Sequence, residues 1–277
     1  MSITDYIFYF FMYSFFGWLG ESIYCSVGNK RWINRGFLRG PMCPIYGTGA
    51  LVLLLCIYPL RELTSNYYIN EVIIFFVGLT VCDIVEFMTS LIMEKLFNAR
   101  WWDYSDRRFN IQGRICLTHT LYWGTAACLF AFVIQPIVSE YFINMINPAS
   151  RKTIVYIVLT VFALDLADTV INALGIRDFS SKFKKLSDDI AAFAVTAYSK
   201  VETKVGQFTE DSRAELEENF NSLKQRYEEL KTESKNKTNK TKKRLLNAFP
   251  YIVDGVKRQE KVIDDLLDDL KNKIKKK

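Results

Sequence analysis

Five carboxylic acids lie inside stretches of the sequence that are otherwise apolar. They are Glu21, Asp83, Glu86, Asp165 and Asp168. No Lys or Arg stands at a comparable depth in these stretches. An ionised side chain at the centre of a membrane helix costs roughly 2.5–3.5 kcal/mol on insertion scales, so acids in such positions need a partner or a function. These five residues are therefore the first candidates for chemistry.

The spacing of four of these acids places them on two helical faces. Asp83 and Glu86 are three residues apart, as are Asp165 and Asp168, and residues at this spacing share one face of a helix. At about 1.5 Å per residue, both pairs lie in the middle and inner half of their stretches and can face each other. One interpretation is structural, with the acids protonated or hydrogen-bonded to neighbouring helices. We favour the other, a polar cavity that opens toward the cytoplasm and pairs the acids with arginines.

The polar loop of residues 98–114 alternates arginines with aromatic residues. Aromatic rings anchor at the membrane–water boundary, and guanidinium groups pair with phosphates or carboxylates. We expect contacts with headgroups, with a ligand or with the acids from this loop, from the preceding polar loop and from a single histidine. The candidates are Arg35, Arg39, Arg100, Trp101, Trp102, Asp103, Arg114 and His119. A lone histidine beside headgroups is more often structural than an acid–base group.

Five apolar stretches are long enough to cross a bilayer, which takes about 20 residues. They cover approximately residues 4–26, 41–60, 71–97, 115–139 and 153–176. Residues 1–176 carry twelve basic and twelve acidic side chains, whereas residues 177–277 carry 24 and 18 and hence the whole net charge of +6. The composition predicts an all-α protein: a polytopic membrane helix bundle of five spans (residues 1–176), followed by a cytoplasmic helical, heptad-patterned tail (residues 177–277).

The distribution of Lys and Arg predicts the orientation. The loops after the first and third spans, with their margins, carry nine basic residues against three in the opposite loops. Because basic loops remain in the cytoplasm, the N-terminus is expected outside and the tail inside a multi-pass protein of the cell membrane. No signal-peptide pattern precedes the first span. The six cysteines form no C-x-x-C pair, so we predict free thiols, no metal and no cofactor.

Several runs of the membrane region resemble a known family. They are Gly17-Trp18 to Gly49, Glu86 to Leu117 with its Trp-Trp-Asp-Tyr-Ser-Asp segment, and Trp123-Gly124. Here the chain is similar to the CmpB family of type IV ABC-transporter permeases, which are largely bacterial. Residues 244–250 also resemble a short element near the family's C-terminus, whereas Arg107-Arg108 is more basic than the family pattern. The resemblance implies a membrane-embedded permease subunit. A separate ATPase is then needed, because the sequence has no G-x-x-x-x-G-K-[ST] phosphate loop.

The tail has the periodicity of amphipathic helices. Apolar residues step by three and four over residues 179–197 and 216–230. These helices can pair with each other as an antiparallel hairpin, pair with a second copy, or dock onto the membrane part. For the Lys-rich residues beyond them, docking on the lipid bilayer and a merely solvated face are both open. Acids are mixed with the bases and Trp is absent, so we predict no nucleic acid partner.

Three functions remain open at this stage. We favour a permease-like transport subunit with a carboxylate-lined polar cavity and a separate ATPase. A membrane-embedded enzyme or binder that acts on lipid headgroups is the second, and an adaptor that recruits partners through its tail is the third. The sequence contains no recognised catalytic motif, so we assign no catalytic residues.

Overall fold

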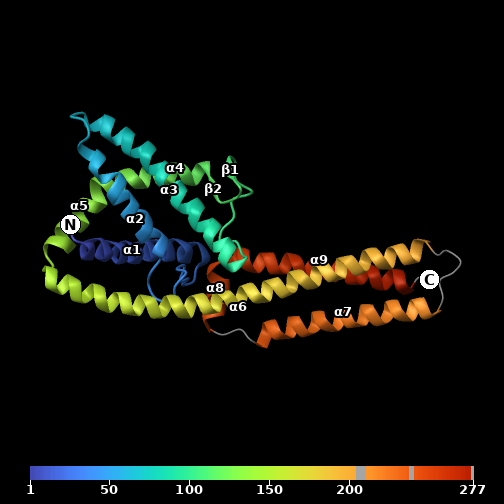
Figure 1. Ribbon diagram of the computed structural model, residues 1–277. Coiled ribbons are helices and arrows are strands. Elements are labelled where there is room, and N and C mark those ends of the chain that lie inside the picture. The colour runs from blue at the N-terminus through green and yellow to red at the C-terminus, as the bar shows by residue number, and fades with distance from the viewer. Residues whose placement is uncertain (204–209, 237–239, 276–277) are drawn as a thin grey trace.

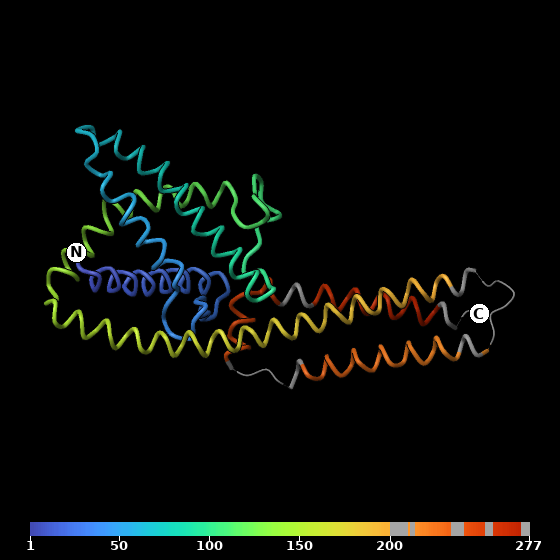
Figure 2. Tube along the Cα trace, viewed as in Figure 1, coloured from blue at the N-terminus to red at the C-terminus, as the bar shows by residue number. Residues whose placement is uncertain are grey.

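The protein has a helical bundle and a long helical projection. The computed structural model describes residues 1–203, 210–236 and 240–275. We call residues 1–176 the membrane part and residues 177–275 the arm. Helix α6 (Pro148–Thr203) runs unbroken through both. Figure 2 shows that the N-terminus lies at the end of the membrane part farthest from the arm.

The membrane part is built from helices, of which α1 (Ile3–Asn29) and α3 (Tyr67–Phe97) begin at side-chain caps. It also contains α2 (Pro44–Cys56) with the short 3-10 helix η1 (Tyr58–Glu62), and α4 (Leu117–Leu129). The hydroxyl of Ser2 accepts a hydrogen bond from the N–H of Asp5 at 3.3 Å, and the Asp5 carboxylate accepts the N–H of Ser2. This reciprocal pair satisfies two N–H groups that a helix start leaves free. At the start of α3 the side chain of Asn66 accepts the N–H groups of Tyr68 and Ile69, without a reciprocal bond.

Helix α4 is continued by two wider turns. The π-helical segment η2 (Phe130–Ile134), the short helix α5 (Gln135–Val138) and the π-helical segment η3 (Ser139–Asn144) follow it without a break. Pro136 lies in this region and has no N–H to donate, and wider turns are one way in which a helix accommodates such a residue. Buried Gln135 accepts a hydrogen bond from the hydroxyl of Tyr13, which ties this region to α1.

Four helical segments are long and apolar enough to cross a membrane. Among the described residues they are Pro44–Glu62, Tyr67–Phe97, Leu117–Asn144 and Pro148–Ser199. They correspond to the second to fifth predicted stretches. The first stretch also forms a helix, α1, but its tyrosines, serines and two acids lower its hydropathy below that of the other four. The protein is thus a multi-pass membrane protein, and the count of five spans stays a prediction.

A small β-hairpin interrupts the helical pattern between α3 and α4. Strand β1 (Asn110–Ile111) pairs antiparallel with β2 (Ile115–Cys116). Gly113 in the turn has a φ of +69°, a left-handed conformation that glycine adopts at little cost. The sequence pattern of this loop predicts no strand, and the hairpin gives the loop a defined shape.

The membrane part packs around a core that joins α1, α2, α3 and α4. Tyr9, Ile57, Ile74 and Ala127 are almost completely buried in it. At Gly78 of α3 an added Cβ would stand 2.2 Å from the Cβ of Ala127 in α4. The two helices therefore approach through a residue without a side chain, a common arrangement where packing must hold membrane helices together.

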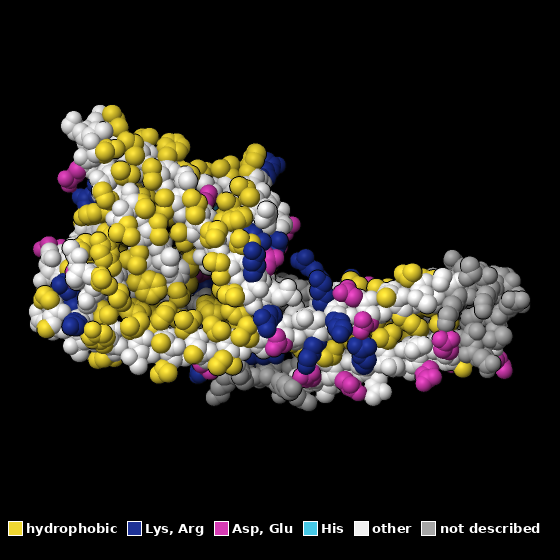
Figure 3. All heavy atoms as spheres, in the orientation of Figure 1, with side chains coloured by type: hydrophobic (Ala, Val, Ile, Leu, Met, Phe, Trp, Pro, Cys, Tyr) yellow, Lys and Arg dark blue, Asp and Glu magenta, His cyan; other side chains and the backbone are white. Residues whose placement is uncertain are grey.

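The arm has its own apolar core. Its other helices are α7 (Glu210–Asn236), α8 (Lys240–Ala248) and α9 (Pro250–Lys275). Side chains from the distal part of α6, from α7 and from α9 meet in one buried cluster that includes Phe183, Ile190, Leu216, Tyr227 and Ile263. Of the tail arrangements left open by the sequence, pairing within the chain is thus present. Charged side chains gather on the arm and at its base, whereas apolar ones cover the membrane part (Figure 3).

Helix α8 docks onto the membrane part. Leu245 and Phe249 are buried against Phe97, Trp101 and Ile176, and the rings of Trp101 and Phe249 lie 4.6 Å apart in an edge-to-face arrangement. The tail therefore meets the membrane part through an apolar cluster where the arm begins. We call this region the junction.

Candidate functional site

The acids of α6 bind the loop between α1 and α2. The carboxylate of Asp165 accepts the backbone N–H of Arg39 at 3.0 Å and that of Gly40 at 2.7 Å. The side chain of Asp168 pairs with the guanidinium of Arg39 at 3.4 Å and lies 3.5 Å from the hydroxyl of Thr241 in α8. The α6 carboxylates therefore fasten the loop and α8 to the same span.

Glu21 of α1 forms an ion pair with Arg35 of the same loop. The Nε atom of Arg35 lies 3.2 Å from a carboxylate oxygen of Glu21, and both side chains are mostly buried. The guanidinium also stacks over the ring of Phe249 at 4.7 Å, a cation–π contact that strengthens when water is excluded. Arg35 thereby connects α1 to the tail.

The acids of α3 bind different partners. Asp83 accepts a hydrogen bond from the hydroxyl of Thr120 at 2.6 Å. Glu86, which is 5% exposed, accepts one from the ring N–H of Trp123 at 2.7 Å and one from the hydroxyl of Tyr104 at 3.1 Å. The second oxygen of Asp83, Oδ1, is buried and has no hydrogen-bond partner in the described part of the chain.

The two acid pairs do not meet. Within the described residues, no hydrogen bond or ion pair connects Asp83 or Glu86 to Asp165 or Asp168. The α3 acids are bound by α4 and the hairpin loop, and the α6 acids by the α1–α2 loop and α8. The structure therefore shows no direct contact between the two stripes among the described residues, and a cavity that they share stays a prediction. The pairing of Glu21 and Asp168 with arginines of the first loop is present.

Two arginines of the hairpin loop converge on Glu94 at the end of α3. Arg114, whose side chain is 9% exposed, forms an ion pair with Glu94 and donates to the hydroxyl of Ser90 at 3.3 Å. Arg100 lies 3.4 Å from Glu94 and 3.4 Å from Asp103. These contacts hold both ends of the loop against one helix end.

The environment of Asp103 favours its charged form. Burial on its own would raise the pKa, but hydrogen bonds from the hydroxyl and N–H of Ser105, together with the charge of Arg100, outweigh burial and hold the pKa of Asp103 below its ordinary value of 3.8. The same carboxylate explains the turn glycine, because a Cβ on Gly113 would stand 2.4 Å from Oδ1 of Asp103.

The tryptophans of this loop contact protein groups in the described structure. Trp101 is 3% exposed and packs edge-to-face on Phe37 and Phe97. The ring N–H of Trp102 donates to the carbonyl of Arg114 at 3.0 Å. The exposed aromatic side chain of the loop is instead Phe109, at 79% exposure.

His119 lies at the start of α4, beside the hairpin. Its ring stacks on Tyr104 with centroids 4.3 Å apart, and its Nδ1 atom lies 3.1 Å from the thiol of Cys116. Tyr104 in turn binds Glu86. In the described residues no cluster of three or more His, Cys, Asp or Glu side chains could hold a metal ion.

Arg244 of α8 completes the junction, and sequence reasoning did not single it out. Its guanidinium donates to the backbone carbonyls of Gly36 at 2.7 Å and Phe37 at 2.6 Å. Burial lowers the pKa of Arg244 to about 10, although nearby Asp165 favours its charged form. The group therefore stays protonated at neutral pH. The sequence feature that could have indicated Arg244 is its position directly before the apolar segment of residues 245–249.

Comparison with known proteins bears directly on the membrane part. A family model described as "Putative ABC-transporter type IV", the CmpB family, matches residues 8–170. The chain belongs to this family. No curated protein and no solved structure matches it.

The family match covers all five acids and ends before the arm. Glu21, Asp83 and Glu86 lie well inside it, and Asp165 and Asp168 lie within its last six residues. The junction is therefore made of two kinds of sequence, the family region and the tail that contributes Arg244 and Phe249. The matched residues support a transporter-related membrane protein in which the acids belong to the shared region.

Proposed function

We propose that the protein is the permease-like membrane subunit of an ABC-type transporter that works with a separate ATPase. Membership of the CmpB family supports this role. The sequence contains no phosphate-binding loop of the G-x-x-x-x-G-K-[ST] type, so the proposal places ATP hydrolysis in another polypeptide. In this proposal the ATPase binds the arm side of the membrane part.

The observation that carries the proposal is the continuity of α6. This helix has 56 residues, which at 1.5 Å per residue is about 84 Å, against about 30 Å for the hydrocarbon core of a bilayer. One rigid element therefore connects the span that bears Asp165 and Asp168 to the far end of the arm. A partner that moves the arm would move these carboxylates relative to the first loop.

In this proposal α1 is a fifth span. Ion pairs join it to other elements near both of its ends: Asp5 lies 3.3 Å from Arg151 just inside α6, and Glu21 pairs with Arg35. With five spans and nine basic residues against three in the opposing loops, the positive-inside rule places the N-terminus outside and the arm in the cytoplasm.

The acids retain a role in the proposed transport pathway. In the described arrangement each of the acids on α3 and α6 is bound by protein donors. A polar pathway would form when Asp165 and Asp168 lose their contacts with the α1–α2 loop while Asp83 and Glu86 keep theirs. We therefore propose that the two acid pairs meet the substrate one after the other and do not line a single cavity together.

Purification of the complete chain from its native membranes tests the proposal. A tagged protein extracted in mild detergent should retain a second polypeptide that carries a phosphate-binding loop and hydrolyses ATP. The variant Asp165→Ala/Asp168→Ala should still bind that polypeptide but uncouple its ATPase rate from the membrane subunit. Recovery of the chain with no nucleotide-hydrolysing partner, under conditions that preserve known membrane complexes, would reject the transport role.

A further inference from the structure

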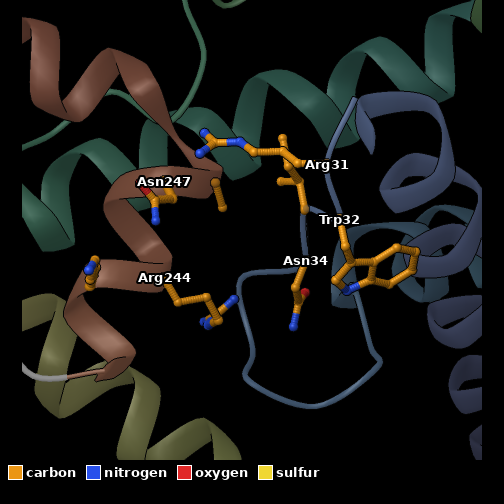
Figure 4. Close-up of a pocket in the computed structure, with 8 residues that line it drawn as sticks. Arg31, Trp32, Asn34, Arg244 and Asn247 are labelled. Carbon is orange, nitrogen blue, oxygen red and sulfur yellow. The ribbon is translucent and has the colours of Figure 1, made fainter. Parts of the chain in front are cut away.

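A basic pocket lies beside the junction, and of the residues that line it only Arg244 takes part in the contacts described so far. It has a volume of about 360 Å³ and lies between the α1–α2 loop and α8. Figure 4 shows Arg31, Trp32 and Asn34 on the loop side and Arg244 and Asn247 on α8. Lys243 completes the basic lining, and no acidic residue lines the pocket.

The chain builds this pocket from two elements that are fixed in place. Lys30 adopts a left-handed conformation after α1, and the N–H groups of Lys30 and Arg31 bond back to the carbonyls of Val27 and Ser26. This C-terminal cap sets where the loop leaves the helix. On the other wall, the bonds from Arg244 to Gly36 and Phe37 hold α8 against the same loop.

Two of the three cations are available to a ligand. Arg31 and Lys243 are exposed, and no ion pair found in the described residues involves either side chain. Arg244 is committed to the loop carbonyls, so it contributes positive potential while it holds the wall in place. Asn34 is likewise committed, because it accepts from the ring of Trp18 and donates to the carbonyl of Arg39. The pocket therefore has a fixed wall and two lining cations, Arg31 and Lys243, that no ion pair among the described residues engages.

The position of the pocket indicates which anion it meets. It lies at the C-terminal end of α1, on the arm side of the apolar membrane part, and we therefore assign it to the headgroup level of the arm-side leaflet. Trp32 is 62% exposed at its rim and packs edge-on to Trp18, and exposed tryptophan is typical of the headgroup level of a bilayer. A volume of 360 Å³ lies in the range of small-ligand sites.

We propose that this pocket binds the phosphate of an anionic phospholipid headgroup in the leaflet on the arm side. Arg31 and Lys243 pair with the phosphate, and the acyl chains run from Trp32 along the apolar helices of the membrane part, away from the arm. Bound lipid would bridge the first loop and α8 and so stabilise the docking of the arm. This inference does not depend on the transport role.

Native mass spectrometry of the full chain in detergent tests the proposal. Phosphatidylglycerol and phosphatidylcholine are added separately, and the bound lipid is counted for the wild type and for Arg31→Gln/Lys243→Gln. Each cation near an anionic lipid is worth about a five-fold gain in binding, so the double variant should bind phosphatidylglycerol about 30-fold more weakly. The matched control Lys224→Gln/Lys271→Gln removes the same charge from exposed positions on the arm and should bind like the wild type.

A third arm uses inorganic phosphate to separate a lipid from a free anion. Millimolar phosphate should not displace the bound lipid. Equal retention of phosphatidylglycerol by the wild type and the pocket variant would overturn the proposal, as would equal binding of the two lipids. Phosphate binding that depends on Arg31 and Lys243 without any lipid preference would also overturn it, because the ligand would then be a soluble anion.

Discussion

At the scale of residues, most charged side chains near the junction fasten loops to helix ends. Glu94 receives both Arg100 and Arg114, and Asp165 receives two backbone N–H groups. A charge that is removed from water is retained only where partners replace the lost hydration. In the described arrangement these acids therefore hold loops in place. A transport function that uses them must break and remake these contacts.

The ion pair of Arg114 should be worth more than an exposed arginine of the same loop. Arg114→Ala leaves Glu94 with a single partner and opens the contact with Ser90. We expect the free energy of unfolding to fall by about 1–3 kcal/mol, because a mostly buried group loses its hydrogen-bond partner. Thermal unfolding of the purified protein, followed by tryptophan fluorescence in detergent, measures this loss.

The matched control is Arg108→Ala, which removes an exposed side chain from the tip of the loop. It should change the midpoint by less than the error of the measurement, since exposed charges contribute little to stability. Equal midpoints for the two variants would show that the contact between Arg114 and Glu94 contributes nothing to stability.

The hairpin loop should weaken in acid through Asp103. Its pKa is lowered on folding, so its contribution to stability is present above the ordinary value of 3.8 and is lost as the pH falls through the folded pKa. Thermal midpoints of the wild type and Asp103→Asn should differ at pH 6 and converge toward pH 3. The control Asp106→Asn removes the charge of an exposed neighbour and should leave the midpoint at pH 6 close to that of the wild type. A gap between wild type and Asp103→Asn that is constant over this range would contradict the assignment.

Residue spacing predicted the faces of the acids but not their partners. The three-residue steps placed Asp83 with Glu86 and Asp165 with Asp168. Which neighbour reaches each pair depends on how the helices are rotated against one another. Thr120 and Trp123 of α4 fill the space beside α3, and backbone N–H groups, which sequence patterns do not mark, fill the space beside Asp165.

At the scale of elements, the close contact of α3 and α4 depends on a missing side chain. Gly78→Ala would place a methyl group 2.2 Å from the Cβ of Ala127, whereas at Gly20 an added Cβ meets nothing within 4 Å. We expect Gly78→Ala to lower stability by about 1–3 kcal/mol, as overpacking does. Gly20→Ala should leave it unchanged or raise it slightly, because alanine favours helix.

Thermal midpoints of the two glycine variants, measured side by side, decide this point. A Gly78→Ala protein as stable as the wild type would mean that α3 and α4 can separate without cost. That result would also remove the reason for regarding α3 and α4 as a tightly packed pair around Asp83 and Glu86.

Element positions were largely accessible from the sequence. Apolar length predicted the helices of the second to fifth spans, and the three- and four-residue steps of the tail predicted amphipathic helices. Pairing within the chain was one of three arrangements that the sequence left open for them. The β-hairpin was not predicted, because two-residue strands leave no periodicity to read. The sequence also left open what α8 docks onto, because Leu245 and Phe249 can be buried against a protein surface as well as against a lipid surface.

At the scale of the whole molecule, the number of spans decides whether the two termini lie on the same side of the membrane or on opposite sides. Epitope tags on the two ends of the complete chain test this in intact and permeabilised cells. With α1 as a fifth span, the N-terminal tag should bind antibody in intact cells and the C-terminal tag only after permeabilisation. Both tags becoming accessible only after permeabilisation would mean four spans and would place Glu21 outside the bilayer.

The unbroken course of α6 has a geometric consequence for its register. Each residue of an α-helix turns the chain by about 100°. The hydrogen bonds that Asp165 accepts from the backbone of residues 39 and 40 orient the part of α6 in the membrane part. The packing of Phe183 and Ile190 against α7 and α9 orients its distal part. Loss of a single residue between these two stretches would swing the distal helices by more than a quarter of a circle around the axis of α6. Evolution can therefore lengthen or shorten this connection in whole turns far more readily than by one residue.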